Sequence, residues 1–318
     1  MKKVILSLSF GLISLIAFSA NTVGDTCSII TFAIIGDYGS NDSNEFRVAQ
    51  MVKNWDPDFI VSAGDNSYDD DSGDKLRTNV GKYYGDYIYN AKDTTVNTHH
   101  EGKAYLAKKN LFFPCMGNHD AKSDESFKNY LKYFNIPKNY TVSWGPCKMY
   151  FFYSGPHGHS NGNGEFDGET KAFIKSNLTS QVSNDSFQLV FFHHPPYCST
   201  KIGNPKIREA FDFDTLNVDA VICGHEHLYE RIARKAGIAD APPIYIVCGS
   251  GGAELEKEKV IEKRSLEPKF YSAHLDYEHF GAIKATIICT LNIKIIYFEY
   301  YTVDSAGYHL DDKYFLKK

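Results

Sequence analysis

The sequence lacks several features by which a protein is often assigned to a class. It contains no Cys-x-x-Cys pair, so a structural zinc site built on thiolates is not expected. Basic residues are not in excess, because 34 Lys and Arg stand against 39 Asp and Glu, for a formal charge of −5 at pH 7. We therefore expect no nucleic-acid partner. The sequence also has no internal repeat and no low-complexity block.

Long apolar runs are missing after the N-terminus, so no later segment is expected to cross a bilayer. The chain begins MKKVILSLSFGLISLIAFSA, in which Lys2 and Lys3 precede an apolar stretch from Val4 to Phe18. This pattern predicts a signal peptide over residues 1–20, and hence a secreted or lysosomal protein. The alternative is a retained N-terminal anchor, for which the apolar stretch is short.

Cysteine is scarce, and the total of 7 is odd. An oxidising compartment permits disulfides, but at least one thiol then stays unpaired or bonds another chain. Cys223 and Cys248 lie in apolar runs and are expected to be small buried residues. N-glycosylation sequons agree with secretion, and we expect glycans at some of Asn41, Asn139, Asn177 and Asn184.

The composition is typical of a folded protein, because 43% of the 318 residues are hydrophobic and 23% are charged. No shift in composition marks a boundary, so residues 21–318 are predicted to form one domain. Apolar runs alternate with helical spacing in Asn44–Trp55 and Glu169–Leu178, which predicts an α/β fold with largely parallel pairing. The predicted strands are Ile29–Ile35, Phe59–Ala63, Leu111–Met116, Lys148–Tyr153, Gln188–Phe192, Ala220–Cys223 and Ile244–Cys248.

The C-terminal part of the chain has a different pattern. Ala282–Ile288 and Ile293–Tyr301 are rich in β-forming residues, and Cys289–Asn292 joins them without a helix. We expect antiparallel strands that extend a sheet at its edge.

Polar side chains follow several of the predicted strands at the point where each strand ends. Because the carboxyl ends of strands in an α/β sheet share one rim, we expect these side chains to lie close together. Oxygen and nitrogen donors without sulfur suit first-row divalent or trivalent metals. They exceed the needs of one ion, and two ions bridged by a carboxylate can hold both oxygens of a phosphoryl displacement. The residues are Asp37, Asp65, Asn118, His119, Asp120, His193, His194, His225 and His227.

In chain order these residues resemble the motifs of the metallophosphoesterase family. The blocks are Gly36-Asp37, Gly64-Asp65, Gly117-Asn118-His119-Asp120, His193 and Gly224-His225-Glu226-His227. The resemblance runs from about Ile29 to Gly252. It implies an α-β-β-α sandwich of mixed sheets, with a metal site at the C-terminal ends of the strands.

Tyr68, three residues after Asp65, resembles the purple acid phosphatase branch, in which a tyrosinate binds ferric iron and gives visible colour. The segment GHEHLYER at 224–231 is also similar to that branch. Ser/Thr protein phosphatases carry Asp-Arg-Gly after the second block, whereas this chain has Asn66-Ser67-Tyr68-Asp69-Asp70 without the arginine. Asp37 follows the predicted signal closely, so the chain resembles the short form, similar to tartrate-resistant acid phosphatase.

The resemblance implies two neighbouring metal ions, Fe(III) and a second divalent ion of iron, zinc or manganese. The ligands of Fe(III) would be Asp37, Tyr68 and His227. The ligands of the second ion would be Asn118, His193 and His225. Asp65 would bridge the two ions.

The implied reaction is that of an acid phosphatase, in which a metal-bound hydroxide attacks a small phosphomonoester. His119 would contact the phosphate or protonate the leaving oxygen, and Asp120 would orient His119. Related enzymes often carry a further histidine about nine residues after the position of His193, where this chain has Ile202. His194 would replace it only if its side chain turns inward.

Two alternative functions stay open at this point. The same metals could serve a phosphodiesterase or a nucleotidase, because the shape of the cleft is not readable from the sequence. The chain could also be a non-catalytic, metal-binding secreted protein, although the intact ligand positions argue against this.

Overall fold

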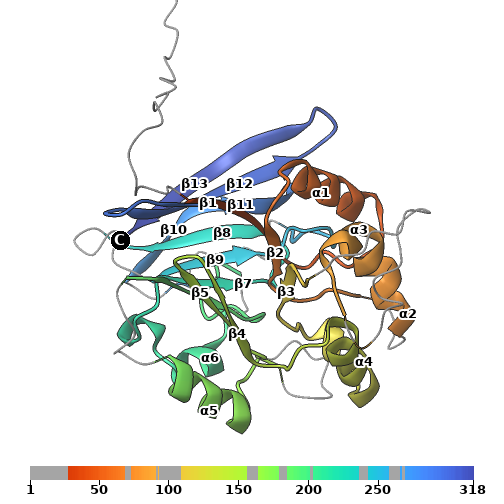
Figure 1. Cartoon of the computed structure of the whole chain (residues 1–318), viewed down its shortest axis with the longest axis horizontal. Coiled ribbons are helices and arrows are strands. Elements are labelled where there is room, and N and C mark those ends of the chain that lie inside the picture. Colours follow the sequence, from red (N-terminus) through yellow and green to blue (C-terminus); the bar gives the residue numbers. More distant parts are fainter. Residues whose placement is uncertain are drawn as a thin grey trace, which may run out of the picture.

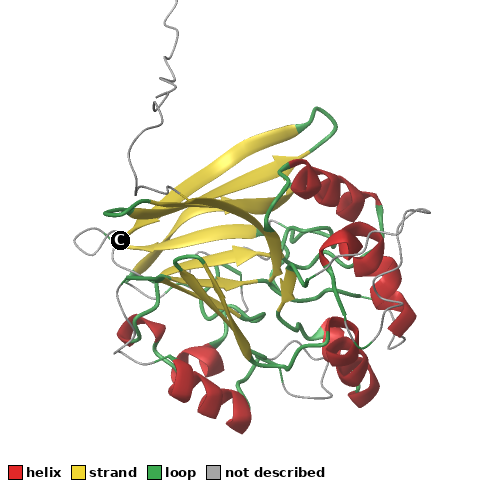
Figure 2. Ribbon diagram, viewed as in Figure 1, coloured by secondary structure: helices red, strands yellow, loops and turns green. Residues whose placement is uncertain are grey.

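The computed structural model describes residues 28–68, 73–90, 92, 109–155, 164–178, 185–200, 203–235, 243–257, 266 and 269–318. In these residues two β-sheets pack face to face, and helices lie on the outer side of each (Figure 1, Figure 2). The predicted α-β-β-α sandwich of mixed sheets is therefore confirmed. The predicted signal peptide, residues 1–20, lies outside the described residues.

The first sheet has six strands, of which three at one side are parallel and three at the other side are antiparallel. Its strands are β1 (Ser28–Ile35), β2 (Phe59–Ser62), β3 (Phe112–Pro114), β11 (Phe280–Cys289), β12 (Lys294–Val303) and β13 (Tyr308–Lys317). The order is β13-β12-β11-β1-β2-β3, with β1, β2 and β3 parallel. β11 pairs antiparallel with β1 and with β12, which confirms that the C-terminal strands extend a sheet at its edge.

The second sheet has seven strands in the order β10-β8-β9-β7-β6-β5-β4. Its strands are β4 (Tyr140–Trp144), β5 (Cys147–Phe151), β6 (Phe187–Phe191), β7 (Ala220–Cys223), β8 (Tyr229–Arg234), β9 (Ile244–Cys248) and β10 (Phe270–Asp276). Parallel pairing joins β5, β6, β7 and β9, whereas β4, β8 and β10 are antiparallel.

The prediction of largely parallel pairing is wrong at the sheet edges. The unpredicted strands include β4 and β13, whose residues are mostly exposed or half-buried. A strand that is solvated on one side carries alternating polar residues and does not form a continuous apolar run. The pattern of apolar runs therefore predicts the buried parallel strands and misses three of the four edge strands, β4, β10 and β13.

The two predicted helices are confirmed as α1 (Ser43–Asn54) and α5 (Gly168–Asn177). The Asp42 side chain caps α1 by accepting from the amides of Asn44 and Glu45. The first sheet carries α1 on its outer side with α2 (Gly73–Leu76), α3 (Lys82–Tyr84) and α4 (Asp124–Phe134). The second sheet carries α5 and α6 (Pro205–Ala210). No helix in the described part of the chain is long and apolar enough to cross a membrane.

The largest core lies between the sheets and is rich in stacked aromatic rings. The ring centroids of Phe32 and Phe59 lie 4.7 Å apart, and those of Phe151 and Phe191 lie 5.2 Å apart. Cys223 and Cys248 are buried, as expected, and no disulfide joins the cysteines of the described ranges.

One predicted glycosylation site does not fit the fold. Asn139 is only 6% exposed, and its amide nitrogen donates to Thr170 Oγ1 at 3.1 Å. Its amide oxygen accepts from the Tyr153 amide at 2.9 Å, so a glycan has no room there. Asn41 is exposed and Asn177 is half-buried, and Asn184 lies outside the described residues.

Asp312 on β13 joins the edge of the first sheet to the second sheet. Its carboxylate accepts two hydrogen bonds from the Arg231 guanidinium on β8, at 2.7 and 2.9 Å, and one from Tyr229 Oη at 2.9 Å. The bidentate geometry fits the planar guanidinium. Asp312 is 8% exposed, so both charged groups depend on this pairing.

Asp312→Ala is expected to lower the free energy of unfolding by about 3 kcal/mol, because Arg231 is left with a largely buried, unpaired charge. Urea unfolding followed by tryptophan fluorescence measures the change. The matched control is the double variant Arg231→Met, Asp312→Leu, which should lose less because no charge stays buried. Equal losses in the single and double variants would contradict this explanation.

Candidate metal centre

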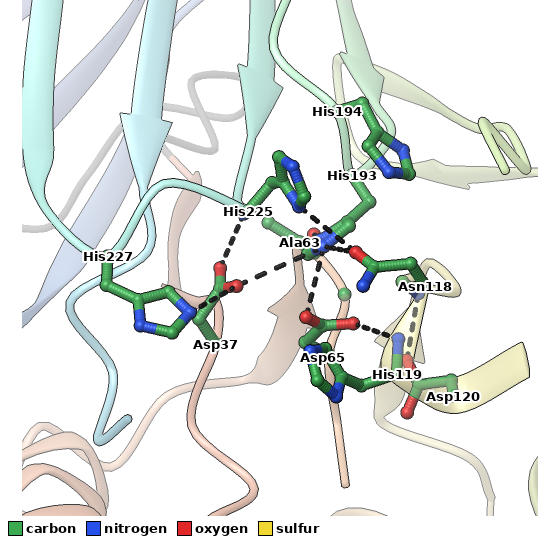
Figure 3. Close-up of polar contacts among 12 residues, drawn as sticks. Asp37, Ala63, Asp65, Asn118, His119, Asp120, His193, His194, His225 and His227 are labelled. Atoms are coloured by element: carbon green, nitrogen blue, oxygen red, sulfur yellow. Dashed lines mark hydrogen bonds and ion pairs between the residues drawn. The ribbon is translucent and has the colours of Figure 1, made fainter. Parts of the chain in front are cut away.

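The predicted site lies where the C-terminal ends of strands from both sheets meet (Figure 3). The strand-end pattern by itself predicted only that these ends share one rim. The first sheet contributes Asp37 after β1, Asp65 after β2 and Asn118 after β3. The second contributes His193 after β6 and, after β7, the histidines of the Gly-His-x-His block. Packing of the sheets therefore assembles the site, which no single sheet could form.

The first group of donor atoms comes from Asp37, Tyr68 and His227. Tyr68 Oη lies 3.1 Å from Asp37 Oδ1 and 3.0 Å from His227 Nε2. His227 Nε2 and Asp37 Oδ1 are 3.6 Å apart. The three residues that the family resemblance implies as ligands of one ion thus bring a carboxylate, a phenol and an imidazole close together.

The second group comes from Asn118, His193 and His225. Asn118 Oδ1 lies 3.1 Å from His193 Nε2 and 3.0 Å from His225 Nδ1. Asp65 Oδ2 adds a carboxylate oxygen 3.3 Å from His193 Nε2. Nitrogen and oxygen donors without a thiolate suit a first-row divalent ion.

Asp65 lies where the two groups adjoin. His193 Nε2 is 4.0 Å from Asp37 Oδ1, and donor atoms of Asp37, Asp65 and His193 all lie within 4.8 Å of one another. A single carboxylate there is able to contact ions in both groups. The donor chemistry and this spacing fit a pair of metal ions that share Asp65.

Backbone carbonyls orient two of the histidine rings. The Nδ1 atom of His193 lies 2.9 Å from the Ala63 carbonyl oxygen, and that of His227 lies 2.6 Å from the Glu254 carbonyl oxygen. Because a carbonyl only accepts, each Nδ1 carries a proton, and in the neutral imidazole it is Nε2 that is left to bind a cation. This arrangement is common among histidines that bind metals.

Two buried carboxylates dominate the electrostatics of the site. Burial opposes a charge on His193, but Asp65 and Asp37 outweigh it and raise the pKa of His193 to about 10. Burial raises the pKa of Asp37 to about 6, and burial together with Asp37 raises the pKa of Tyr68 well above its usual range. The carboxylates of Asp37 and Asp65 thus create a site that favours a positive charge. The Tyr68 phenol stays protonated next to them, but a bound cation would favour its phenolate form.

The backbone at the strand ends is unusual. Asp37, Asp65 and His225 have φ values of 54°, 50° and 75°, in the left-handed region that residues with a side chain rarely adopt. Strain of this kind is typical of functional sites. The glycines of the motifs supply space: a Cβ on Gly117 would meet the Asp65 carboxylate, and one on Gly224 would meet that of Asp37.

Asp120 has a different role from the one expected. Its carboxylate accepts from the amides of Gly117, Asn66 and Ser67, at 2.8 to 3.1 Å, and from the Asn66 side chain at 2.8 Å. These bonds fasten the loop after β2 to the loop after β3. Nδ1 of His119 is buried without a hydrogen-bond partner, so the expectation that Asp120 orients the His119 ring is not supported.

Asn66 makes several hydrogen bonds that the sequence does not predict, because an Asn after Gly-Asp is common in turns. Its side chain is fully buried and accepts from Tyr38 Oη at 2.8 Å and from Ser62 Oγ at 2.6 Å. It also donates to the Cys115 carbonyl at 3.0 Å. Full burial of an amide requires such pairing, and it fixes the loop that carries Asp65 and Tyr68.

His119 lies beside the first group of donors. Its backbone amide donates to Asp65 Oδ1 at 2.8 Å, and its ring lies against that of Tyr68 with centroids 4.6 Å apart. Lys122 donates from Nζ to the Tyr68 carbonyl at 3.1 Å, which supports the same loop from the outside. The imidazole is thus fixed at the edge of the site with its Nδ1 unpaired.

The His194 side chain turns toward the site, but it packs against the ring of His225. Its ring centroid lies 4.5 Å from that of His225, and the position of Ile202 is outside the described residues. Ser154 Oγ accepts from the amides of His193 and His194, so its own hydrogen is left for His194 Nδ1 at 2.9 Å. His194 is therefore the Nε2–H tautomer, and burial lowers its pKa well below the usual value.

Ser154 was not among the predicted site residues, although a signal for it exists in the sequence. It directly follows the predicted strand Lys148–Tyr153, in the same position relative to a strand as the ligands. Through His194 it supports the orientation of His225.

The cluster of Asp37, Asp65 and His193 could hold a metal ion, and the donor groups around it have the chemistry of metal sites. A family model described as calcineurin-like phosphoesterase matches residues 24–229, and the chain belongs to this family.

Individual relatives are distant. Purple acid phosphatase 23 of Arabidopsis thaliana is 24% identical over 254 residues, which cover 72% of this chain and 53% of that protein. The chain thus spans about half the length of this relative. The comparison supports the resemblance to purple acid phosphatases that the motifs suggested.

Solved structures with the same fold include purple acid phosphatase PPD1 from yellow lupin, Lupinus luteus. It has a TM-score of 0.59 and 16% identity, over 91% of this chain and 53% of that one. GAP50, described as the anchor in the inner membrane complex of Plasmodium, has a TM-score of 0.56 and 17% identity, over 90% of this chain and 88% of that one. At these identities the likeness concerns the fold.

Ser154→Ala is expected to weaken metal binding by about 10-fold, as loss of a group that orients a ligand does. The alanine leaves two backbone amides and His194 Nδ1 unpaired, which loosens the packing on His225. Competition with a chelator, followed by elemental analysis of the protein, measures the change.

Ser123→Ala is the matched control. Ser123 caps α4 through the Ser126 amide, so its loss should cost about 1 kcal/mol of stability and leave metal affinity unchanged. Equal metal affinity in the Ser154→Ala variant and the unmodified protein would refute the positioning role.

Proposed function

We propose that this protein is a two-metal acid phosphatase of the purple acid phosphatase type, which hydrolyses small phosphomonoesters. Fe(III) would be bound by Asp37, Tyr68 and His227. A second divalent ion of iron, zinc or manganese would be bound by Asn118, His193 and His225. We also propose that the protein is secreted or lysosomal, with N-glycans at one or more of Asn41, Asn177 and Asn184.

A single observation carries this proposal. All seven predicted ligand side chains, on loops from two sheets, direct donor atoms into two adjoining groups that meet at Asp65. The likeness to purple acid phosphatase 23 supports the choice of branch, and the phenol of Tyr68 in the first group supports Fe(III), because phenolate is a hard anionic donor.

Several groups of the chain have defined tasks in such a reaction. When bound, the cations supply Lewis-acid stabilisation of the phosphoryl oxygens and lower the pKa of water at the site. His119 is placed by its amide bond to Asp65 to donate to a phosphate oxygen or to the leaving oxygen. Asp120 holds the loops of Asp65 and Asn118 together, and the Ser154–His194 pair fixes His225.

Asn118→Ala is expected to lower the rate of p-nitrophenyl phosphate hydrolysis by more than about 100-fold. Loss of a group that only supports a metal ligand costs about 10- to 100-fold, and loss of a ligand itself should cost more. Asn54→Ala, at the exposed end of α1, is the matched control and should keep full activity. Full activity in the Asn118→Ala variant would indicate that the activity comes from a contaminant, and would favour a non-catalytic protein. Faster hydrolysis of bis-p-nitrophenyl phosphate than of the monoester would favour a phosphodiesterase.

Tyr68→Phe tests the assignment of iron. The native protein is expected to be pink to purple through charge transfer from the phenolate to Fe(III), and the Tyr68→Phe variant is expected to be colourless. A visible spectrum with elemental analysis for iron measures this. Tyr140→Phe, which loses only a bond to the Pro114 carbonyl, should keep the colour. Colour that persists in the Tyr68→Phe variant, or native protein without iron, would contradict the assignment.

A further inference from the structure

The outer face of the six-stranded sheet is covered at one end only. α1 packs over the end near the metal centre, where Trp55 contacts Tyr301 with ring centroids 5.5 Å apart. Beyond α1, none of the described helices lies over the remaining part of β1, β11, β12 and β13 (Figure 1). On this uncovered part, the side chains that point away from the core between the sheets have no described helix packed against them.

These side chains form two neighbouring rows of cross-strand pairs. The first row joins Ile29, Ile288 and Ile295 and ends at Lys317. The second row joins Thr31, Thr286, Tyr297 and Phe315. Ile29 is 65% exposed and Phe315 is 55% exposed, and the rings of Tyr297 and Phe315 are in contact at 5.9 Å. An exposed, continuous apolar face of this kind usually has a partner.

The turn between β11 and β12 extends this face. Leu291 is 74% exposed and Ile293 is 41% exposed, and both belong to the turn that follows Cys289. Large aliphatic side chains at the tip of a hairpin do not contribute to the core. They are, however, well placed to enter an apolar environment outside the protein. We call the two rows and this turn the apolar sheet end.

Lysines border the apolar sheet end. A third row across the same face joins Lys284, Glu299 and Lys313, and Lys317 ends the first row. The three lysines outnumber Glu299 and Asp58, whose carboxylate accepts from the Thr31 amide, so the charge on this face is positive although the whole chain carries −5. Apolar side chains bordered by lysines are typical of surfaces that bind anionic membranes.

Strand β1 begins near the turn between β11 and β12. Ser28 opens β1 and pairs with Cys289 at the beginning of the turn that carries Leu291. β1 therefore begins beside the apolar sheet end.

A second copy of the chain is a poorer partner for this face. A twofold axis through the face would set its three lysines against the same lysines of the other copy, with Glu299 and Asp58 too few to offset them. An anionic surface offsets all three. It also accommodates a protruding turn, which two flat sheet faces do not.

We propose that the apolar sheet end docks on an anionic lipid surface, with the Leu291 turn in the acyl boundary and the lysines at the headgroups. This would hold the metal centre, at the opposite end of the strands, toward solution. The proposal does not depend on the proposed catalytic function.

Sedimentation with phosphatidylcholine vesicles, with and without phosphatidylserine, tests it on protein purified from the medium of secreting cells. The protein should bind vesicles that contain phosphatidylserine, and binding should weaken in high salt. Lys313→Gln with Lys317→Gln should lower partitioning by about 25-fold, taking about fivefold for each lysine. Leu291→Asp with Phe315→Asp should abolish it.

The matched control is Phe46→Asp, which places the same change at a 46% exposed aromatic residue on α1. It should bind as the unmodified protein does, and unchanged thermal unfolding establishes that each variant is folded. No binding to either vesicle, or binding that the Leu291 and Phe315 variant retains, would overturn the proposal. A concentration-dependent dimer that this variant abolishes would also overturn it, in favour of a second copy.

Discussion

The position of Asp65 is the constraint on which the rest of the site depends. Its carboxylate lies within reach of both donor groups, and its backbone is held in a left-handed conformation after β2. The close approach of Gly117 and the hydrogen bonds that Asp120 accepts from the Asn66 and Ser67 amides keep it there. Two cations that share one ligand need that ligand fixed within a few tenths of an ångström, which explains the density of buried hydrogen bonds around it.

Much of the site could be predicted because its residues share one simple relation to the chain. Asp37, Asn118 and His193 each come within a few residues of the end of an apolar strand, and strand ends of neighbouring parallel strands lie together. The same relation holds for Ser154, but serine is common in turns, so its position alone does not mark it. The two-sheet architecture was expected only through the family resemblance, because strand order is decided by tertiary packing and not by any local pattern along the chain.

The roles of Asn66 and Asp120 show a second limit of sequence reasoning. Both residue types are common in turns, so their presence after Gly-Asp and Asn-His has an ordinary local explanation. In the structure both are buried and paired with groups on other loops. Burial of a polar side chain is a property of the assembled fold, and no spacing along the chain reveals it. The edge strands were missed for the related reason that solvation hides them among polar residues.

The pairing of β1 with β11 has a consequence for how the chain acquires its fold. β1 carries Asp37 at its end, but the partner on one of its sides, Phe280–Cys289, is synthesised near the end of the chain. Until then the apolar strand Ser28–Ile35 has an open edge, available to any other extended segment. Such long-range pairing is slow and exposes the chain to aggregation. The open edge of Ser28–Ile35 therefore lasts until most of the chain has been synthesised, and only the last strands close it.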